Sequence, residues 1–207
     1  MTGYFMQSPK WIQHLFSTYI WRMDTNSPSI YLTFDDGPSP EITNWVLQLL
    51  ENEKIPATFF LIGDKIVKFP KAANKVLTSH HHIGNHSFNH LVGWKTNNTR
   101  YLENIDQCQI HTQTNLFRPP HGKIKPSQAK ALIRKGYKII MWDVLSGDFD
   151  QSLSPQYCLT QLKKHTRNGS ILVFHDSEKG FKTLKAILPL YISWAKSKGY
   201  NFKAIPY

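Results

Sequence analysis

Short apolar runs rich in β-branched and aromatic residues alternate along the chain with stretches whose apolar residues recur at helical spacing. Runs of the first kind are typical of buried strands, and the second pattern is typical of amphipathic helices. The pattern predicts strands at residues 30–32, 57–61, 82–84, 116–117, 138–142, 171–174 and about 202–204. It predicts helices at about residues 40–50, 70–79, 101–113, 126–135, 155–168 and 181–198.

Strands and helices therefore alternate about seven times, which indicates an α/β protein with a mainly parallel sheet. The length of 207 residues suits a single domain. A deformed or incomplete (β/α) barrel of about seven strands fits this length better than a complete barrel of eight. We expect an aromatic N-terminal arm at residues 1–28, followed by the main domain at residues 29–207.

The chain carries a formal net charge of +11, from 25 Lys and Arg residues against 14 Asp and Glu residues. A positive excess of this size favours acidic partners. The basic residues are scattered and form no dense run of the kind found in nucleic-acid-binding arms. We therefore expect a positive field that concentrates an anionic substrate, and no nucleic-acid partner.

Residues 11–21 are apolar but interrupted by polar residues, and they lack a basic start and a small-residue cleavage site. The sequence therefore predicts no signal peptide and no transmembrane segment, and hence a cytoplasmic protein. Cys108 and Cys158 are far apart and form no CxxC pair, so neither indicates a cysteine-based metal or redox site.

Residue types that carry chemistry follow the predicted strands. Asp35 and Asp36 come after the first strand, and the Gly-Pro pair behind them places both on a turn. His86 and His90 follow the third strand, and if this segment is helical both imidazoles project from one face. With Asp36 they offer two histidines and one carboxylate, which suits catalytic Zn²⁺ and also fits Co²⁺, Fe²⁺ or Ni²⁺.

Each of these patterns also occurs without a function. An Asp-Asp-Gly turn is an ordinary strand end, and two histidines four residues apart are common on exposed helices. Asp148 lies in a Ser-Gly-Asp stretch that is an equally ordinary turn, and we interpret the histidines at residues 80–82 as structural. We nevertheless interpret these residues as a functional site, because reactive residues follow one strand after another, where the loops of a (β/α) barrel converge.

Five segments resemble, in order, the motifs of the polysaccharide deacetylases, which share the NodB homology domain of carbohydrate esterase family 4. They are TFDDGPS at residues 33–39, HSFNH at 86–90, RPPHG at 118–122, the segment 142–149 and LVFH at 172–175. The resemblance extends from about residue 29 to the C-terminus, and it implies the deformed (β/α) barrel of that family.

The first three motifs imply one half of a catalytic site. By resemblance, Asp36, His86 and His90 would bind the metal. Asp35 would be the general base that takes a proton from the attacking water. Arg118 would pair with Asp35 and hold it ionised and oriented.

The remaining residues imply the other half. His175 would be the general acid that protonates the departing amine, and Asp148 would orient it and favour its charged form. The backbone N–H of His121 would assist at the acetyl carbonyl, and Leu172 would line the pocket for the acetyl methyl. The chain departs from the family pattern at His121, where Tyr or Phe is usual, and at Phe149, where Trp is usual.

The implied activity is that of a metal-dependent hydrolase that removes N-acetyl groups from N-acetylated sugars in a glycan or oligosaccharide. Two alternatives stay open. The same residues could remove O-acetyl groups from xylan or a similar glycan, because an alcohol leaving group needs less help from the acid. The fold could also belong to a non-catalytic carbohydrate-binding protein, which would be expected to lose the base or a ligand, whereas here both are present.

Overall fold

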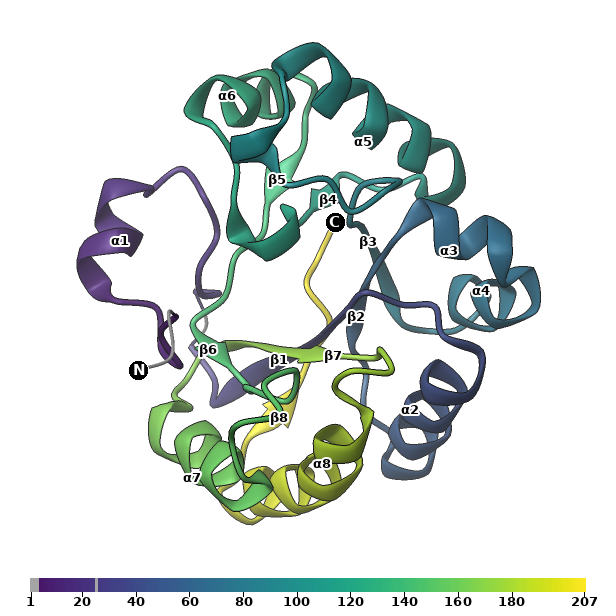
Figure 1. Cartoon of the computed structure of the whole chain (residues 1–207). Coiled ribbons are helices and arrows are strands. Elements are labelled where there is room, and N and C mark those ends of the chain that lie inside the picture. The colour runs from purple at the N-terminus through teal and green to yellow at the C-terminus, as the bar shows by residue number, and fades with distance from the viewer. Residues whose placement is uncertain (1–3, 25) are drawn as a thin grey trace.

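The computed structural model describes residues 4–24 and 26–207, so residues 1–3 and 25 of the expected arm lie outside the described part. The strands are β1 (Ser29–Asp35), β2 (Thr58–Leu61), β3 (His82–Asn85), β4 (Leu116–Phe117), β5 (Lys138–Ile139), β6 (Val144–Leu145), β7 (Ile171–His175) and β8 (Asn201–Phe202). Their order is β5-β4-β3-β2-β1-β7-β6, all pairs are parallel, and β8 pairs with the start of β1. The sheet curls into half a barrel, which confirms the predicted deformed (β/α) barrel (Figure 1).

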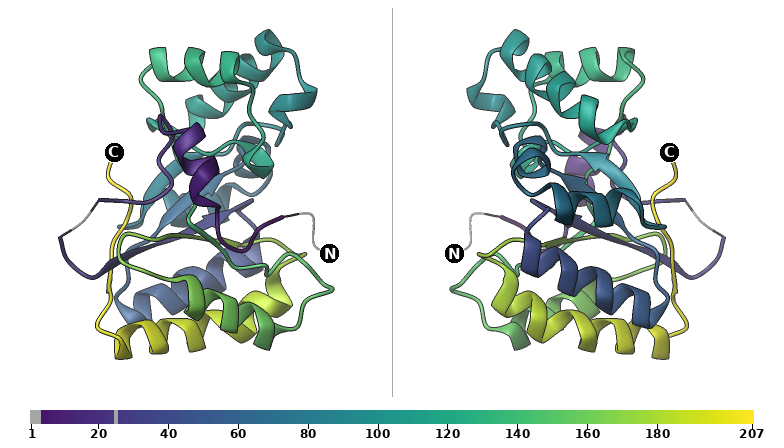
Figure 2. Two further views of the ribbon diagram at one scale, coloured as in Figure 1. Left: turned by 90° about the vertical axis from the view of Figure 1, so that its left-hand side faces the viewer. Right: turned by 90° about the vertical axis from the view of Figure 1, so that its right-hand side faces the viewer.

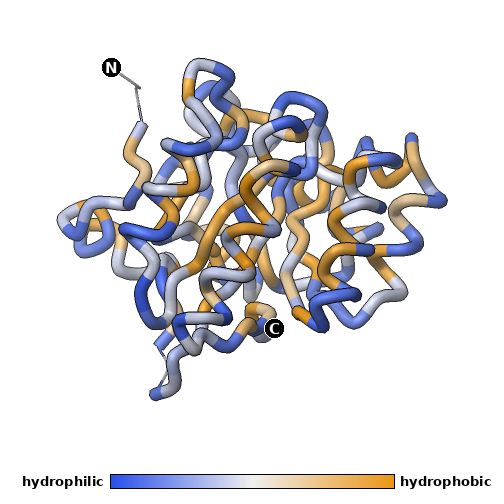
Figure 3. The backbone as a smooth tube through the Cα atoms, turned by 90° about the horizontal axis from the view of Figure 1, so that it is seen from below, coloured by the Kyte–Doolittle hydropathy of each residue, from blue (hydrophilic) through white to orange (hydrophobic). Residues whose placement is uncertain are grey.

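Helices cover the outside of this sheet. They are α1 (Lys10–Leu15), α2 (Pro40–Glu53), α3 (Gly63–Lys68), α4 (Pro70–Leu77), α5 (Asn98–Thr112), α6 (Pro126–Arg134), α7 (Pro155–His165) and α8 (Phe181–Ser197), with short 3-10 turns η1 (Gly93–Lys95) and η2 (Pro120–Gly122). Helices α2, α7 and α8 lie together beside β1 and β7, whereas α5 and α6 lie at the other end of the sheet (Figure 1). Hydrophobic segments run through the middle of the molecule, and the surrounding helices alternate between apolar and polar positions (Figure 3).

Strand β1 separates two cores because successive side chains point to opposite faces. Leu32 and Phe34 are fully buried on the helix side, in the large cluster that α2, α7 and α8 complete. Tyr31 faces the concave side, in a smaller cluster with Phe60 and with Ile205 from the C-terminal segment. That segment crosses the amino ends of β2 and β3, where the N–H of Ile205 donates to Thr58 Oγ1 at 2.9 Å. Beyond Tyr31, the residues of β1 on this concave side are the polar Thr33 and Asp35, and Asp35 ends the strand.

The N-terminal arm bonds to both free edges of the half-barrel. The N–H of Leu145 in β6 donates to the carbonyl oxygen of Met6 at 2.8 Å, and the N–H of Ile20 donates to that of Ile139 in β5 at 2.8 Å. Helix α1 lies between these two contacts, over the gap between the edges (Figure 2). Trp21 is buried in the core cluster under α5 and α6. The arm therefore covers the open side of the sheet; the domain boundary at residue 28 stays a prediction.

The sequence pattern did not predict helix α3 or strand β6. Helix α3 has six residues, too few to show a helical period, and β6 has two residues directly after the predicted strand at 138–142. Within residues 4–24 and 26–207, no helix is both long enough and apolar enough to cross a membrane.

Candidate active site

The predicted site residues gather at the carboxyl ends of the strands. Asp35 ends β1 and His175 ends β7, and the parallel register places these two residues side by side. His86 follows β3 directly and Arg118 follows β4, on the other side of β1. Because every strand runs in the same direction, these ends form one rim.

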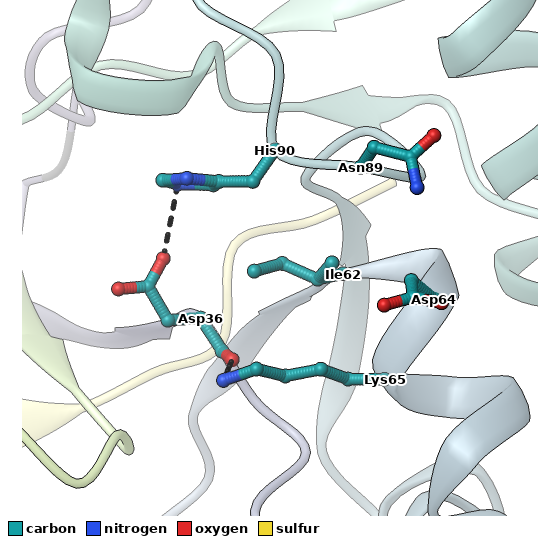
Figure 4. A pocket seen from close by; sticks show the side chains of 6 residues that line it. All are labelled: Asp36, Ile62, Asp64, Lys65, Asn89 and His90. Carbon is teal, nitrogen blue, oxygen red and sulfur yellow. Dashed lines mark hydrogen bonds and ion pairs between the residues drawn. The ribbon is translucent and has the colours of Figure 1, made fainter.

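Asp36, His86 and His90 offer a set of metal donors. One ligand atom from each lies within 4.8 Å of the others. Asp36 Oδ1 is 3.6 Å from His86 Nε2 and 3.1 Å from His90 Nε2 (Figure 4). Burial alone would raise the pKa of Asp36, but the hydrogen bonds from the two histidines outweigh it and lower that pKa well below its usual range.

The donor chemistry fits a divalent metal ion. His86 Nδ1 is 2.8 Å from the carbonyl oxygen of Arg118, so Nδ1–H donates, and in the neutral ring the lone pair of Nε2 would be available to a metal ion. Two imidazoles and one carboxylate leave coordination positions for water or substrate, as catalytic zinc sites do. A cavity of about 350 Å³ opens beside Asp36 and His90 (Figure 4).

The HSFNH segment forms a turn, and the helix considered for it is wrong. Ser87 has φ 62° and His90 has φ 54°, values that an α-helix does not contain. Asn104 of α5 holds this turn: its Oδ1 accepts the N–H groups of Phe88 at 3.0 Å and Asn89 at 2.9 Å, and its Nδ2 donates to Asn89 Oδ1 at 2.7 Å. The imidazoles meet because the chain folds back between them.

Sequence reasoning missed Asn104, although helix α5 carries a signal for it. Tyr101, Asn104, Ile105 and Cys108 share the buried face of this helix. A polar side chain on a buried face needs hydrogen-bond partners, because an unpaired buried amide is costly. An asparagine at such a position therefore indicates a contact with another segment, here the turn that carries both histidines.

Strained left-handed backbone conformations are concentrated at the site. The non-glycine residues there with a left-handed backbone are Asp36 (φ 75°), Ser87 (φ 62°), His90 (φ 54°) and His121 (φ 57°). The only other two in the described chain cap helices α2 and α5 at their C-terminal ends. Left-handed conformations of this kind cost on the order of 1–3 kcal/mol each and are typical of functional sites. The surrounding contacts must hold them in place.

Arg118 and Asp35 form a buried ion pair. Arg118 is fully buried, and its Nη1 donates to Asp35 Oδ1 at 2.6 Å and to Thr33 Oγ1 at 2.7 Å. The rest of the guanidinium donates to the carbonyl oxygens of Ile140 at 3.2 Å and Met141 at 3.0 Å. A guanidinium fixed on all sides sets the direction of the carboxylate.

His175 and Asp148 form a second pair on the other side of β1. His175 Nδ1 lies 2.8 Å from Asp148 Oδ1, and the backbone N–H of His175 donates to Asp148 Oδ2 at 2.8 Å. Burial alone would lower the pKa of His175, but the charge and hydrogen bond of the fully buried Asp148 outweigh it and raise that pKa to about 9. The imidazole therefore carries a proton at neutral pH and presents Nε2–H toward the site.

His121 and Phe149, the two departures from the family pattern, border this arrangement. The His121 ring lies 4.7 Å from the His90 ring, and the Phe149 ring lies 5.0 Å from the His175 ring. Burial and the neighbouring His90 lower the pKa of His121, so its ring is neutral at pH 7. One ring thus lies beside a candidate metal ligand and the other beside the candidate acid.

Leu172 does not line the site, and the expectation that it would is wrong. Its side chain is fully buried on the helix side of the sheet, in the same cluster as Phe174. Because side chains alternate along a strand, Val173 shares the face of His175 and Leu172 does not. The register places Val173 opposite Thr33 of β1. All four residues before His175 are apolar, so the available signal in the sequence was alternation counted back from His175, which selects Val173.

Three further side chains hold the turn that carries the aspartates. The fully buried Asp176 accepts a hydrogen bond from Thr43 Oγ1, and its N–H donates to the Asp35 carbonyl oxygen at 3.1 Å. Lys65 Nζ donates to the Asp36 carbonyl oxygen at 2.7 Å (Figure 4). An acidic residue directly after an apolar strand was the available signal for Asp176, whereas nothing in the sequence connects Lys65 to this turn.

Replacing Asp176 with asparagine should make the metal-free protein less sensitive to alkaline pH. Burial raises the pKa of Asp176 from 3.8 to about 7, so between these values the unfolded chain releases a proton that the folded chain retains. The contribution of Asp176 to stability is therefore present below pH 4 and is lost as pH rises to 7. Between pH 5 and 8 the native protein should lose about 3 kcal/mol more unfolding free energy than Asp176→Asn. Urea titrations in chelator measure this difference, and equal losses would contradict the pKa.

Comparison with known proteins agrees with these observations. The sequence profile of the family described as polysaccharide deacetylase matches residues 22–140. A peptidoglycan-N-acetylglucosamine deacetylase of Bacillus cereus is 31% identical over 192 residues, which cover 89% of this chain and 90% of that protein. A chitooligosaccharide deacetylase of Azorhizobium caulinodans is 29% identical over 162 residues, which cover 75% of this chain and 77% of that protein.

A solved structure is similar over almost the whole length. It is that of the Bc1960 peptidoglycan N-acetylglucosamine deacetylase in complex with 4-naphthalen-1-yl-N-oxidanyl-benzamide. It matches with a TM-score of 0.88 and 26% sequence identity, covering 96% of this chain and 95% of that one. The profile, the relatives and the shared fold together show that this chain belongs to the polysaccharide deacetylase family.

Proposed function

We propose that the protein is a metal-dependent hydrolase that removes N-acetyl groups from N-acetylated sugars in a glycan or oligosaccharide. One observation carries this proposal. Three metal donors, a carboxylate paired with a buried arginine, and an imidazolium paired with a buried aspartate share one rim of the sheet. The names of the relatives, which refer to N-acetylglucosamine and to chitooligosaccharides, support an N-acetylated sugar as substrate.

Asp36, His86 and His90 would hold the ion, which fits Zn²⁺ and also Co²⁺, Fe²⁺ or Ni²⁺. When bound, it would polarise the acetyl carbonyl and make water a better nucleophile at neutral pH. The protein fixes the ligands beforehand: the Arg118 carbonyl orients His86, and Lys65 holds the backbone of Asp36.

Asp35 is the residue that we assign as general base. Its carboxylate would accept a proton from the water whose oxygen attacks the acetyl carbon. Arg118 donates to Oδ1 of Asp35, which orients the carboxylate and leaves its other oxygen to receive the proton. The side chain is only 6% exposed, so little water competes for that oxygen.

His175 is the residue that we assign as general acid. As the C–N bond breaks, Nε2–H of the imidazolium would protonate the departing amine, and the products would be acetate and a free amino sugar. Asp148 holds Nδ1–H, which aims Nε2 at the rim and stabilises the positive charge. The neutral backbone N–H of His121 would support the carbonyl oxygen as it gains negative charge.

The protonated form of His175 favours an amide over an ester substrate. An amine leaves poorly unless it is protonated, whereas an alcohol needs less help, so an imidazolium with a raised pKa suits amide hydrolysis. The presence of base, acid and all three ligands supports an enzyme over a non-catalytic binding protein.

The cytoplasmic location predicted from the N-terminal sequence stays a prediction, which cell fractionation would test.

The protein should release acetate from chitooligosaccharides and from peptidoglycan, and should release less from acetylated xylan. Chelation should abolish this release and added Zn²⁺ should restore it, because two histidines and one carboxylate cannot replace the ion they bind. Acetate release across this panel, with metal content by elemental analysis, is the measurement.

The His86→Ala protein is the matched control, since it keeps the base and the acid but removes one metal donor. It should contain less metal and release little acetate. Release from xylan alone would favour the O-acetyl esterase, and full activity in chelator would show that no metal takes part.

A further inference from the structure

The beginning of the N-terminal arm pairs with the edge strand β6 (Figure 1). Gln7 forms an antiparallel bridge with Val144, and the N–H of Leu145 donates to the carbonyl oxygen of Met6 at 2.8 Å. Hydrogen bonds of this kind set the register between two segments. The main chain of the arm is therefore fixed at the point where β6 ends and the loop of residues 146–154 begins.

This loop connects β6 to α7 and supplies two parts of the candidate site, Asp148 and Phe149. The arm packs directly on it, because a Cβ atom on Gly147 would lie only 3.0 Å from Met6 Cε. Gly147 also has φ 74°, a conformation that glycine adopts without strain. A glycine at this position thus allows both the turn and the close contact, just before Asp148.

Tyr4 adds two contacts to the same loop. Its hydroxyl donates to Asp150 Oδ2 at 2.7 Å, and Asp150 Oδ1 accepts the N–H of Ser152 at 3.0 Å. Burial and the neighbouring Asp150 raise the pKa of Tyr4, so the hydroxyl keeps its proton and stays a donor. The Tyr4 ring lies 5.1 Å from the Phe149 ring, at an angle of 49°. The hydrogen bond therefore holds the Tyr4 ring where it packs against Phe149.

Phe149 connects Tyr4 to the candidate general acid. Its ring lies 5.0 Å from the His175 ring at an angle of 71°, which is an edge-to-face arrangement. Within residues 4–24 and 26–207, the aromatic rings in contact with Phe149 are those of Tyr4 and His175. Three rings thus form a continuous row from the arm to the acid.

The hydrogen bond from Asp148 does not by itself fix the His175 ring. The bond is made at Nδ1, at 2.8 Å, and the torsion that turns a histidine ring has a broad energy minimum. The ring can therefore tilt while the hydrogen bond is kept, and a tilt moves Nε2 at the opposite side of the ring. A second contact, made by Phe149 on the ring itself, limits this movement.

We infer that Tyr4 is a positioning residue for the general acid, and that it acts through Phe149 by limiting the tilt of the His175 ring. The inference rests on the proposed function. His175 remains the group that gives the proton, and the arm keeps its Nε2–H aimed at the departing amine. Aim affects the rate because a proton is transferred along a short, aligned hydrogen bond. The N-terminal arm is then a part of the active site as well as a cover for the open side of the sheet.

Two substrates with different leaving groups test this role. Tyr4→Ala should lower kcat for acetate release from an N-acetylated chitooligosaccharide about tenfold and change KM by less than about twofold. With para-nitrophenyl acetate, the nitrophenolate leaves without a proton from the acid, so kcat/KM should stay within about twofold of the native value. Tyr4→Phe keeps the ring that contacts Phe149, and it should recover most of the lost kcat.

Phe5→Ala is the matched control, because it removes a 59% exposed aromatic side chain from the next residue of the arm. It should leave both reactions unchanged. Two results for Tyr4→Ala would overturn the inference: an equal loss on both substrates, which a disturbed fold would give, or a raised KM with an unchanged kcat, which a lost sugar contact would give.

A second measurement does not depend on catalysis. The NMR signals of the His175 ring protons report the position of Phe149, because an aromatic ring shifts the resonances of protons beside it. These signals should move in Tyr4→Ala and stay in place in Phe5→Ala. If the native protein releases no acetate from the oligosaccharide, the proposed function fails, and the spectra still decide whether Tyr4 positions His175. Unchanged His175 signals in Tyr4→Ala would overturn the inference.

Discussion

Replacing Asp35 with asparagine should lower kcat for acetate release by about 10²–10⁴-fold and leave the bound metal almost unchanged. Asparagine has the shape of aspartate, and its oxygen can still accept the hydrogen bond that Arg118 Nη1 now donates at 2.6 Å. It has no basic oxygen, so the proton of the attacking water has no acceptor. Kinetics and elemental analysis of the same preparation measure both effects.

Asp36→Asn is the matched control, because the same change is made one residue away. This variant should lose metal as well as activity, since Asp36 supplies the one carboxylate of the donor set. Excess metal should restore part of its activity, whereas it should not help Asp35→Asn. If Asp35→Asn lost the metal and Asp36→Asn kept it, the two roles would have to be exchanged.

Replacing Arg118 with methionine should lower the free energy of unfolding by about 3–5 kcal/mol. Methionine fills much of the same volume but leaves the buried carboxylate of Asp35 without its counter-charge. It also removes the donors for Thr33 Oγ1 and for the carbonyl oxygens of Ile140 and Met141. Activity should fall with stability, because the base loses its direction. Urea denaturation at neutral pH gives the change in unfolding free energy.

The exposed Lys196–Glu53 pair provides the comparison for this result. Lys196→Met breaks a salt bridge whose side chains are 43% and 39% exposed, and exposed pairs contribute about 0–1 kcal/mol. The two substitutions remove the same charge, so the difference between them measures the effect of burial. Similar losses in both proteins would show that the guanidinium of Arg118 is not essential to the core.

The fold and the position of the site could be predicted because they rest on local patterns. Apolar runs mark the strands of a parallel sheet, and the reactive residues follow those runs. Parallel strands end at one rim, so Asp35, His86, Arg118 and His175 had to come together there. No exact angle or register was needed for that prediction.

Two predictions failed where local spacing was compatible with more than one structure. Histidines four residues apart fit an α-helix, but the turn between His86 and His90 is set by the amide of Asn104, which comes from another helix. Leu172 and Val173 are both apolar and adjacent; alternation along β7 places Val173 on the face of His175, and the pairing of Val173 with Thr33 of β1 agrees.

The sequence by itself determined the order of strands and helices, the half-barrel class, and which residue types stand at the ends of the strands, because hydrophobic periodicity and turn residues act over a few positions. The tertiary structure alone decided how the turn between His86 and His90 is held and which side chains hold the Asp35–Asp36 turn. These depend on partners far away in the chain: Asp176 lies 133 residues from Thr43, and Lys65 lies 29 residues from Asp36. Contacts at such separations form only once the whole sheet has closed around the core.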